Sequence, residues 1–488
     1  MSSLFYGLEI AKTGLNVSQQ GISLTGHNIS NANTVGYTRQ RIIQNSIDPS
    51  NTLSHISKVN KGTIGGGVAI SMIDQVRSDY LDRQYRSKNA TLGNYTKRAE
   101  ELDYLETVMN ELSKNGLSAS MGDFFNSLSE LSGDPVNDEI RTSVQQNAQK
   151  MIESFHHYYT QLTGLQSTYN DNMNVTTTKV NNLLTSISSY NEQIAAYELS
   201  GEQANDLRDK RNLLLDDLSK LINIDYHVDA DNNLIVSCEG VELINHTTIK
   251  KLETVADPTT GFYNIYYEGT STVFKYNDGE LMAYKNLRDG STSSNIGIPY
   301  IVNNLNRLAQ SLAQEFNDIH KTGYTKPIGA AASQTNVNFF DVPAGGYDDI
   351  TAGNLSLSAA VLTSVRNIAA SSVTVTATNS GNNTIALELA ELSSRKDMTD
   401  VGNFEEFLNS VVVELGIASS TSQTLSASQQ AIVDNLASRK ESISGVSLDE
   451  EMVQMMTYQH AYSAASRVLS ALDEALEILI NRTGKVGL

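Results

Sequence analysis

The sequence predicts a multidomain protein that is mainly α-helical with β-rich parts, in which the N- and C-terminal helices pair as a coiled-coil stem. Apolar residues recur at spacings of three and four near both ends of the chain, as in the strands of a coiled coil. The same rhythm runs through residues 137–197, whereas residues 224–290 contain short stretches of period two. These three observations predict a terminal stem and a trunk of long helices that includes a β-rich portion.

The N-terminal stretch predicts one helix with a narrow apolar seam, formed by Leu4, Leu8, Ala11, Leu15, Ser18, Ile22, Thr25 and Ile29. The pattern stops in an asparagine-rich run that begins at His27 and ends at Gln40. Asparagine side chains compete for backbone hydrogen bonds and so end helices. Gly36 permits a backbone turn that other residues resist. We therefore expect a helix with a well-defined polar end.

The C-terminal stretch predicts a second helix, which begins after Ser447 and runs to about Asn481. Ser447 and Glu450 have the spacing of a capping box. One apolar seam on this helix contains Tyr458, Ala461, Ala465, Val468, Leu472, Ala475 and Leu479. A second seam contains Met452, Met455, Tyr462, Leu469, Leu476 and Ile480. Two seams indicate more than one helical neighbour: the N-terminal helix and helices of other molecules. An ordinary intramolecular two-helix stem is the alternative.

The middle of the chain predicts a trunk of long helices. Residues 76–132 carry apolar stripes that Gly116 interrupts, and the turn Gly133-Asp134-Pro135 follows. A helix over residues 137–197 would be roughly 90 Å long at 1.5 Å per residue, a strut rather than part of a compact enzyme core. Further helices are predicted over residues 203–222, 296–321 and 404–415, and around residues 432–436.

Short strands are predicted between these helices, at Ile224–His227, Leu234–Ser237, Val241–Ile244, Tyr263–Tyr267, Val273–Tyr276 and Leu281–Tyr284. From Lys326 to about Ser380 small and polar residues dominate, and further strands are expected there and shortly after, at Val373, Val375, Ile385 and Leu387. We therefore expect three parts. Residues 1–45 with 447–488 form the assembly stem, residues 46–325 with 400–446 form the helical trunk, and residues 326–399 form an outer β-rich insert.

Composition excludes several classes of partner. The 488-residue chain has a formal net charge of 35 − 55 = −20, which argues against a nucleic-acid or anionic-membrane surface. The single cysteine, Cys238, rules out an internal disulfide framework and is expected to be a small buried residue. No stretch reaches the roughly 18 apolar residues of a membrane span. No cleaved secretory signal is visible at the N-terminus, which by itself favours a cytoplasmic protein.

Motifs for catalysis are absent from the sequence. The eight histidines include no His-Glu-x-x-His zinc motif, and no Gly-x-Ser-x-Gly nucleophile elbow is present. His156 and His157 are neighbours on a helix, so they point in different directions. The acidic run Asp449-Glu450-Glu451 is explained by favourable interaction with a helix N-terminus. We expect no enzymatic activity, no metal and no cofactor.

The run Asn28-Ile-Ser-Asn-Ala-Asn-Thr-Val-Gly-Tyr-Thr-Arg-Gln40 resembles the signature of bacterial flagellar rod, hook and hook-associated proteins. Its Gly-Tyr-Thr-Arg-Gln ending most resembles the hook-associated protein 1 family, found at the hook–filament junction. Three further matches support this family: Ala204-Asn-Asp-Leu-Arg-Asp-Lys-Arg211, Glu315-Phe-Asn-Asp-Ile-His-Lys-Thr-Gly323 and Gly445-Val-Ser-Leu-Asp-Glu-Glu451. The matches span nearly the whole chain, apart from about residues 326–400.

The resemblance implies a structural protein that joins the hook to the filament as a homo-oligomeric ring. It implies the hook protein, the second junction protein (hook-associated protein 3) and an export chaperone at the C-terminal helix as partners. It also implies an extracellular location, reached through the flagellar type III export channel without a cleaved signal. The expected assembly interface is Leu4, Leu8, Ala11, Leu15, Ile22, Ile29, Asn31, Asn33, Tyr37, Arg39, Met452, Met455, Tyr458, Tyr462, Val468, Leu469, Leu472, Leu476, Leu479 and Ile480.

Two alternatives remain open from the sequence. Another axial protein, of the rod or the hook, would share the N-terminal motif, but the long strut and the match at residues 204–211 speak against it. A secreted hydrolase with helical stalks would need a cluster of polar catalytic residues, for which the sequence offers no motif.

Overall fold

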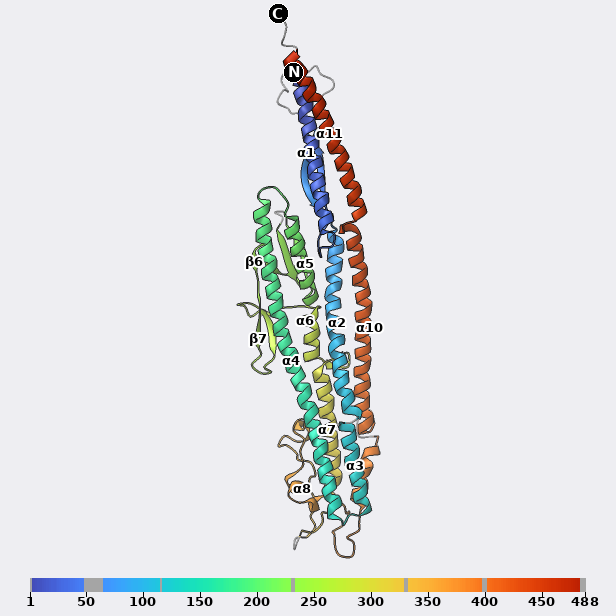
Figure 1. Ribbon diagram of the computed structural model, residues 1–488. Coiled ribbons are helices and arrows are strands. Elements are labelled where there is room, and N and C mark those ends of the chain that lie inside the picture. Colours follow the sequence, from blue (N-terminus) through green and yellow to red (C-terminus); the bar gives the residue numbers. More distant parts are fainter. Residues whose placement is uncertain are drawn as a thin grey trace, which may run out of the picture. The chain divides into compact units, whose positions relative to one another are not determined.

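A computed structural model (Figure 1) describes residues 2–47, 65–114, 116–229, 233–328, 332–396 and 402–482. The chain divides into two compact units. Unit 1 contains Met1–Ala90, Val180–Lys251 and Gln430–Leu488, and unit 2 contains Thr91–Lys179 and Leu252–Gln429.

Unit 1 contains both ends of the chain. Its helices are α1 (Ser2–Asn31), α5 (Asn205–Leu221), α11 (Leu448–Arg482), the start of α2 (Asp79–Lys114) and the ends of α4 (Asp138–Glu198) and α10 (Phe404–Ser444). Strands β1 (Gln40–Ser46) and β2 (Val68–Gln75) form an antiparallel ribbon with an irregularity between Ile43 and Gln44. A four-stranded antiparallel sheet has the order β3 (Asp225–Val228), β4 (Leu234–Cys238), β5 (Val241–Asn245) and β6 (Thr248–Ile249).

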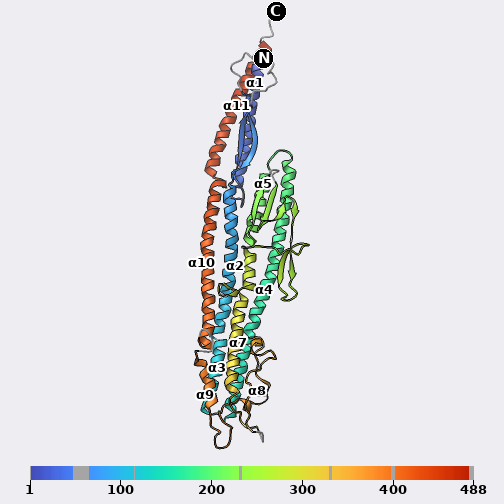
Figure 2. The same ribbon diagram turned by 180° about the vertical axis from the view of Figure 1, so that it is seen from behind.

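Unit 2 is built mainly from α2, α3 (Leu117–Gly133), α4, α7 (Ile298–His320) and α10, with the short helices α6 (Glu280–Asp289), α8 (Ala359–Thr363) and α9 (Thr384–Glu391). Figures 1 and 2 show the long helices of this unit running alongside one another. Two antiparallel pairs add to it, β7 (Leu252–Ala256) with β8 (Tyr263–Tyr267) and β9 (Ser291–Thr292) with β10 (Asn295–Ile296).

The predicted helices and several predicted strands are confirmed. Helix α4 runs unbroken over 61 residues, and α2 and α3 are separated near Gly116 as expected. The first four predicted strands correspond to β3, β4, β5 and β8. The two helical stretches expected near residues 404–436 are one helix of 41 residues, α10.

The strand predicted at Leu281–Tyr284 is wrong, because these residues lie in helix α6. The helix buries Leu281, Tyr284 and Leu287, which are three residues apart and therefore share one face. Gly279, with a φ of +90°, is the N-cap of this helix. The strand predicted at Val273–Tyr276 is reduced to a single bridge between Val273 and Tyr266.

The β-rich character expected for residues 326–399 is also wrong for the described part of this segment. Its residues form short helices and irregular loops, and its only pairings there are isolated bridges such as Phe340 with Leu357. Ile385 and Leu387 lie in α9 rather than in a strand. The division of the chain into stem, trunk and outer insert stays a prediction.

Aromatic residues of this segment belong to the core of unit 2. Phe339 and Phe340 are fully buried, and the Phe339 ring lies 4.5 Å from that of Phe316 on α7. The Asn317 side chain accepts hydrogen bonds from both phenylalanine N–H groups and donates one to the Phe340 carbonyl. A loop that supplies buried rings and satisfied backbone groups contributes directly to the stability of the helices beneath it.

Among the described residues, no helix is long and apolar enough to cross a membrane. Cys238 is buried, and burial, followed by the nearby Glu239 and Asp225 carboxylates, raises the pKa of its thiol to about 12. A thiol with this pKa is protonated at neutral pH and is therefore a poor nucleophile.

His320 at the end of α7 is buried as a neutral ring. Its Nδ1–H donates to the Val337 carbonyl at 2.7 Å, and its Nε2 accepts from the Ala369 N–H at 2.8 Å. Both ring nitrogens are thus engaged in a way that fits only the neutral form, since protonated Nε2 is unable to accept. Burial lowers the pKa of His320 to about 4.

We predict that Phe339→Ala lowers the free energy of unfolding by about 3–5 kcal/mol, the usual cost of emptying a buried aromatic site. Urea unfolding followed by circular dichroism measures this. Ile328→Ala is the matched control, because Ile328 lies in the same segment but is 40% exposed. Equal stability of the two variants would show that the segment stands apart from the core.

We predict that protein stability falls as the pH drops from about 6.5 toward 4. The pKa of His320 is lower in the folded state than in the unfolded state, so its contribution is complete above about pH 6.5 and decreases as the unfolded chain takes up the proton. The full effect is about 3 kcal/mol, from about 1.4 kcal/mol per pKa unit. Melting temperatures across this range, compared between wild type, His320→Gln and the exposed-site control His460→Gln, measure it. A wild-type pH dependence retained by His320→Gln would contradict the assignment.

Candidate assembly interface

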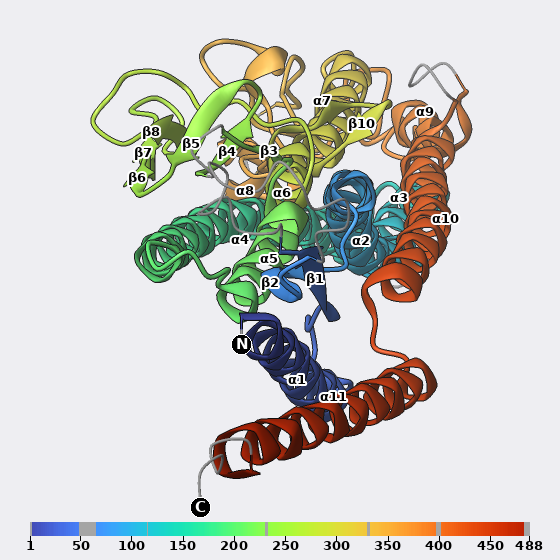
Figure 3. The same ribbon diagram turned by 90° about the horizontal axis from the view of Figure 1, so that it is seen from above.

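The predicted terminal stem is present in unit 1. Helices α1 and α11 lie side by side in every view, with the β1–β2 ribbon on another side of α1 (Figures 1 and 3). The face of α1 that is turned toward α11 carries mainly small or polar side chains, and the buried residues on it and at its edges are Ala11, Val17, Ser18, Gly21, Thr25 and Asn28. The two helices approach closely because these side chains are small.

Glycines at every seventh position set the register of the pair. A Cβ placed on Gly7 would lie 3.4 Å from Leu472 Cδ1, and one placed on Gly14 would lie 3.9 Å from the Ala465 Cβ. A Cβ placed on Gly21 would lie 2.5 Å from Tyr458 Cδ1, which is closer than real Cβ contacts come. The partners on α11 are also seven residues apart, in the opposite direction, so the helices pair antiparallel with a coiled-coil repeat.

The apolar seam expected on α1 is only partly the contact face. Ala11, Ser18 and Thr25 are buried as expected. The large members of the seam flank the contact and are half-buried: Leu8, Leu15, Ile22 and Ile29. Leu4 lies in α1, but its side chain is outside the described ones. The two helices therefore meet at the glycines of α1, which have no side chains. The leucines and isoleucines of α1 lie along the edges of this contact.

The two seams expected on α11 are divided between a half-buried face and an exposed face. The half-buried residues include Met455, Tyr458, Ala465, Leu469, Leu472, Ala475 and Leu476. The exposed residues include Met452, Tyr462, Val468 and Leu479. Ile480 lies in the helix with its side chain outside the described ones. Each predicted seam contributes to both faces.

A polar clasp holds the base of the stem. Glu451, which is only 3% exposed, accepts hydrogen bonds from Asn28 Nδ2 at 3.0 Å and from Arg39 Nε at 2.8 Å. Arg39 Nη1 also donates to Glu450 at 2.7 Å, and the Arg39 N–H donates to the Ser444 carbonyl. A buried carboxylate needs such paired donors, because an unpaired buried charge is costly. These hydrogen bonds therefore connect Asn28 and Arg39, near the N-terminus, to the start of α11.

Tyr37 completes the clasp. Its hydroxyl donates to Asn28 Oδ1 at 2.7 Å and lies 3.0 Å from His27 Nδ1. Burial raises the pKa of Tyr37, and the neighbouring carboxylates Asp206, Asp209 and Glu451 raise it further. The phenol is therefore a neutral hydrogen-bond donor at any physiological pH.

The two asparagines predicted for the interface lie at the end of α1. Asn31 Nδ2 donates to the His27 carbonyl, and Asn31 Oδ1 accepts from the Thr34 hydroxyl, so this side chain shapes the helix end. Asn33 is exposed.

The acidic run at the start of α11 has a more specific role than the predicted dipole effect, because Glu450 and Glu451 bind Arg39. Ser447 directly precedes α11, and its predicted capping box with Glu450 stays a prediction.

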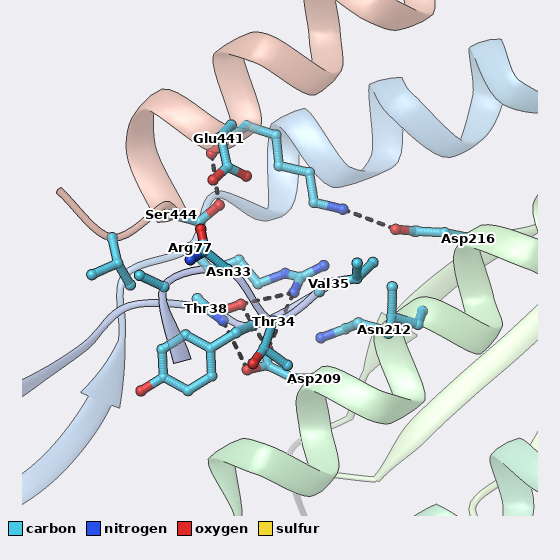
Figure 4. A pocket seen from close by; sticks show the side chains of 16 residues that line it. Asn33, Thr34, Val35, Thr38, Arg77, Asp209, Asn212, Asp216, Glu441 and Ser444 are labelled. Atoms are coloured by element: carbon cyan, nitrogen blue, oxygen red, sulfur yellow. Dashed lines mark hydrogen bonds and ion pairs between the residues drawn. The ribbon is translucent and has the colours of Figure 1, made fainter. Parts of the chain in front are cut away.

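The loop after α1, residues 32–39, packs against α5. This loop, α5 and the end of α10 line a cavity of about 290 Å³ (Figure 4). The Thr38 N–H and hydroxyl both donate to Asp209, at 2.9 and 2.6 Å. Gly36 has a φ of +81°, and a Cβ there would lie 2.6 Å from Leu213, so both conformation and space require glycine. Burial raises the pKa of Asp209, against the lowering effect of the Thr38 hydrogen bonds.

The same loop reaches α5 at two more points. Gln40 Nε2 donates to Asp206, and Asn205 Nδ2 donates to Gln40 Oε1. Asn205 also donates to the Ile73 carbonyl of β2. Two of the sequence motifs that carried the resemblance, at residues 28–40 and 204–211, are therefore hydrogen-bonded to one another.

A cluster of ion pairs continues from this loop to α10. Arg77 pairs with Asp82, and Lys440 lies 3.2 Å from Asp82 and 2.9 Å from Asp216. Burial acts to raise the pKa of Asp82, but Arg77 and Lys440 outweigh it and the pKa is lowered. Arg86, which is almost fully buried, binds Asp216 at 2.7 Å. These charges neutralise one another and bind the ends of α2, α5 and α10 together.

Sequence reasoning missed most of these residues. It assigned no role to Gly7, Gly14 or Gly21, although a seven-residue glycine repeat is visible in the sequence. It treated Asn28 and Glu451 as parts of a helix end and of an acidic run. Their pairing has no sequence signal, because the two residues are 423 positions apart.

The carboxylates of this arrangement are paired with donors, although Arg86 Nη1 and Asn205 Oδ1 are buried without a hydrogen-bond partner among the described residues. The carboxylates Asp82, Asp209, Asp216 and Glu451 each bind donors from the protein itself. Within the described ranges, no group of three or more His, Cys, Asp or Glu side chains is placed to hold a metal ion. Such a network positions helices and loops.

Comparison with known proteins agrees with this structural character. Residues 102–340 match the model of the helical domain of flagellar hook-associated protein FlgK, and residues 440–482 match the C-terminal model of the flagellar basal body rod FlgEFG proteins. Flagellar hook-associated protein 1 of Bacillus subtilis (strain 168) is 30% identical over 523 residues, covering 100% of both chains. The chain belongs to the flagellar hook-associated protein 1 family.

Other members of the family agree over the same length. Flagellar hook-associated protein 1 of Escherichia coli (strain K12) is 24% identical, over 99% of this chain and 100% of that protein. The structure of the flagellar hook junction protein FlgK from Burkholderia pseudomallei has a TM-score of 0.59 and 14% identity, and covers 74% of this chain and 100% of its own. A hook-associated protein 1 is a structural component of the bacterial flagellum at the hook–filament junction, and this is the role of the chain.

We predict opposite effects of two glycine substitutions in the stem. Gly21→Ala would drive a methyl group into the Tyr458 ring and should destabilise the α1–α11 pair by about 1–3 kcal/mol, as overpacking does. Gly14→Ala meets the Ala465 Cβ at an ordinary contact distance and should stabilise α1 by up to about 1 kcal/mol, because alanine favours helix. Amide hydrogen exchange across α1 measures both. Equal protection in the two variants would contradict the antiparallel register.

Proposed function

We propose that this hook-associated protein 1 assembles as a homo-oligomeric ring between hook and filament, and that the exposed faces of the α1–α11 stem make the contacts. Neighbouring copies and the adjoining axial proteins would cover these faces. The hook protein would lie on one side of the ring and the second junction protein, hook-associated protein 3, on the other.

The incomplete burial of the stem carries this proposal. Among the described side chains of α11, Glu451 alone is buried, and every apolar one is half-buried or exposed. Exposed apolar side chains recur along the helix at Leu448, Met452, Val453, Met456, Tyr462, Val468, Ile478 and Leu479. A surface of this kind marks an interaction site on a soluble protein, because leaving it in water forgoes about 25 cal/mol for each Å² of apolar surface.

The charge pattern of the stem supports self-association. A chain with a net charge of −20 repels its own copies wherever both present acidic surfaces. The stretch Met452–Ser466 of α11 contains no Asp, Glu, Lys or Arg, and neither does the stretch Thr13–Thr38 that includes most of α1. Copies can therefore meet along the stem without this repulsion.

The remaining expectations belong to the same proposal. The C-terminal helix, with its exposed methionines, would bind an export chaperone before assembly. The protein would leave the cell through the flagellar type III channel without a cleaved signal and act as an extracellular structural protein without enzymatic activity. The absence of catalytic motifs from the sequence and the structural nature of its relatives support this last point.

The test is assembly of stem variants in a strain that lacks the protein. Val468→Asp and Leu479→Asp should each abolish incorporation at the hook end, because a charge would be buried without a partner in the assembled ring. Both side chains are more than 40% exposed in the chain, so melting of the purified subunit should change by less than about 0.5 kcal/mol. Immunoblots and electron microscopy of isolated hooks measure incorporation.

Ile417→Asp is the matched control, because Ile417 is an exposed apolar residue of α10 outside the stem. This control should assemble, and secretion of all three variants into the medium would show that export is intact. Normal incorporation of Val468→Asp and Leu479→Asp would sink the proposal that the exposed stem face carries assembly.

A further inference from the structure

An open groove lies beside the stem in unit 1. Its volume is about 940 Å³, and it is bounded by α1, β2 and the turn that joins α4 to α5. Its apolar lining comes from Leu24 on α1, Ile70, Met72 and Ile73 on β2, and Tyr197 and Leu207 beside the turn.

The mouth of this groove exposes apolar surface. Met72 is 40% exposed and Tyr197 is half-exposed. Leu199, in the turn next to the groove, is 89% exposed. Two carboxylates, Glu202 and Asp206, lie in the groove lining and are exposed. The groove therefore combines an apolar floor with an acidic edge.

The α11 helix of the same chain packs on a different side of α1. Its contacts on α1 are made at Gly14, Gly21 and Asn28, whereas the groove is lined by Leu24 and His27. At 100° per residue, Leu24 points about 60° and His27 about 120° away from Gly21. Helix α11 of the same chain is therefore not the occupant of the groove.

We infer that the groove receives residues 448–467 of α11 from a second copy of this chain, an inference that rests on the proposed self-assembly. Leu448, Met452 and Met456 recur every four residues and form one stripe, with Val453 beside it. Each of the four is about half-exposed. Methionine side chains are flexible and polarizable, so this stripe can adapt to a groove of mixed shape.

A single cation on the same helix face complements the acidic edge of the groove. Arg467 lies eleven residues beyond Met456, which is three helical turns along the same face. Arg467 is exposed and has no ion-pair partner among the described residues, and His460 lies between the two on that face. A helix that places its methionine stripe on the apolar floor brings a cation toward Glu202 and Asp206.

The contact is heterologous, since the groove and the stripe are different surfaces of one chain. Head-to-tail contacts of this type build rings when the rotation closes and helical arrays when it does not. Each contact can be weak by itself, because neighbours in a ring hold one another at high effective concentration.

The experiment uses paired cysteines in the full-length chain and in assembled flagella. Met72→Cys places a thiol in the groove and Met456→Cys places one on the stripe, in a Cys238→Ala background. Oxidation of isolated hooks that carry the double variant should yield a ladder of crosslinked dimers and larger species. Each single variant should yield about tenfold less, as should a control that pairs Met72→Cys with Ile417→Cys on α10.

The outcomes separate this inference from the proposed function. If the double variant assembles but shows no crosslinks between subunits, or only a disulfide within one subunit, the groove contact is overturned. The proposal that the stem mediates assembly would still stand. Normal incorporation of Val468→Asp and Leu479→Asp would count against the proposed function instead.

A charge exchange provides a second measurement. Glu202→Arg and Arg467→Glu should each reduce incorporation at the hook about tenfold, and the double variant should restore it, because the exchanged pair attracts again. Additive losses in the double variant would show that the two side chains are not partners.

Discussion

The pairing of Glu451 with Asn28 and Arg39 is the interaction on which the stem depends. A carboxylate that is 3% exposed requires donors in fixed positions, and these donors come from the signature near the N-terminus. Asn28 and Glu451 also occupy the next step of the seven-residue register that pairs Gly21 with Tyr458. A shift of α11 by one turn would bury the carboxylate without its partners, so the clasp fixes which side chains meet along the stem.

The same signature connects the stem to the rest of unit 1. Thr38 binds Asp209 and Gln40 binds Asn205 and Asp206, so the loop after α1 is held by the start of α5. From there the ion pairs of Asp216 and Asp82 reach Lys440 near the end of α10. The loop thus links segments that are hundreds of residues apart, which explains why its polar residues are so specific in type and spacing.

Small and large side chains occupy different positions in the α1–α11 stem, and this arrangement suits assembly. Small residues on α1 let the two helices approach closely, and this contact uses little apolar area. The larger leucine, isoleucine and methionine side chains remain at the edges and on the outer face. The folded subunit therefore retains exposed apolar surface, and burial of this surface against other molecules would favour association.

The sequence by itself determined the positions of the long helices, from apolar spacing, and the strands β3, β4, β5 and β8, from period two. It also placed Tyr37 and Arg39 at the polar end of α1, where the structure shows them bound to Asn28 and Glu451; their part in an assembly interface stays a prediction. It failed at Leu281–Tyr284, because a short apolar stretch fits a strand and a helix equally until its neighbours choose one face.

Only the tertiary structure decided which side of α1 faces α11. Hydrophobic periodicity weighs large side chains, whereas this contact depends on the absence of side chains at Gly7, Gly14 and Gly21. Only the fold could reveal the pairing of Asn28 with Glu451, or the burial of Phe339 in a segment rich in small and polar residues. Such contacts join residues far apart in the chain, and local spacing carries no information about them.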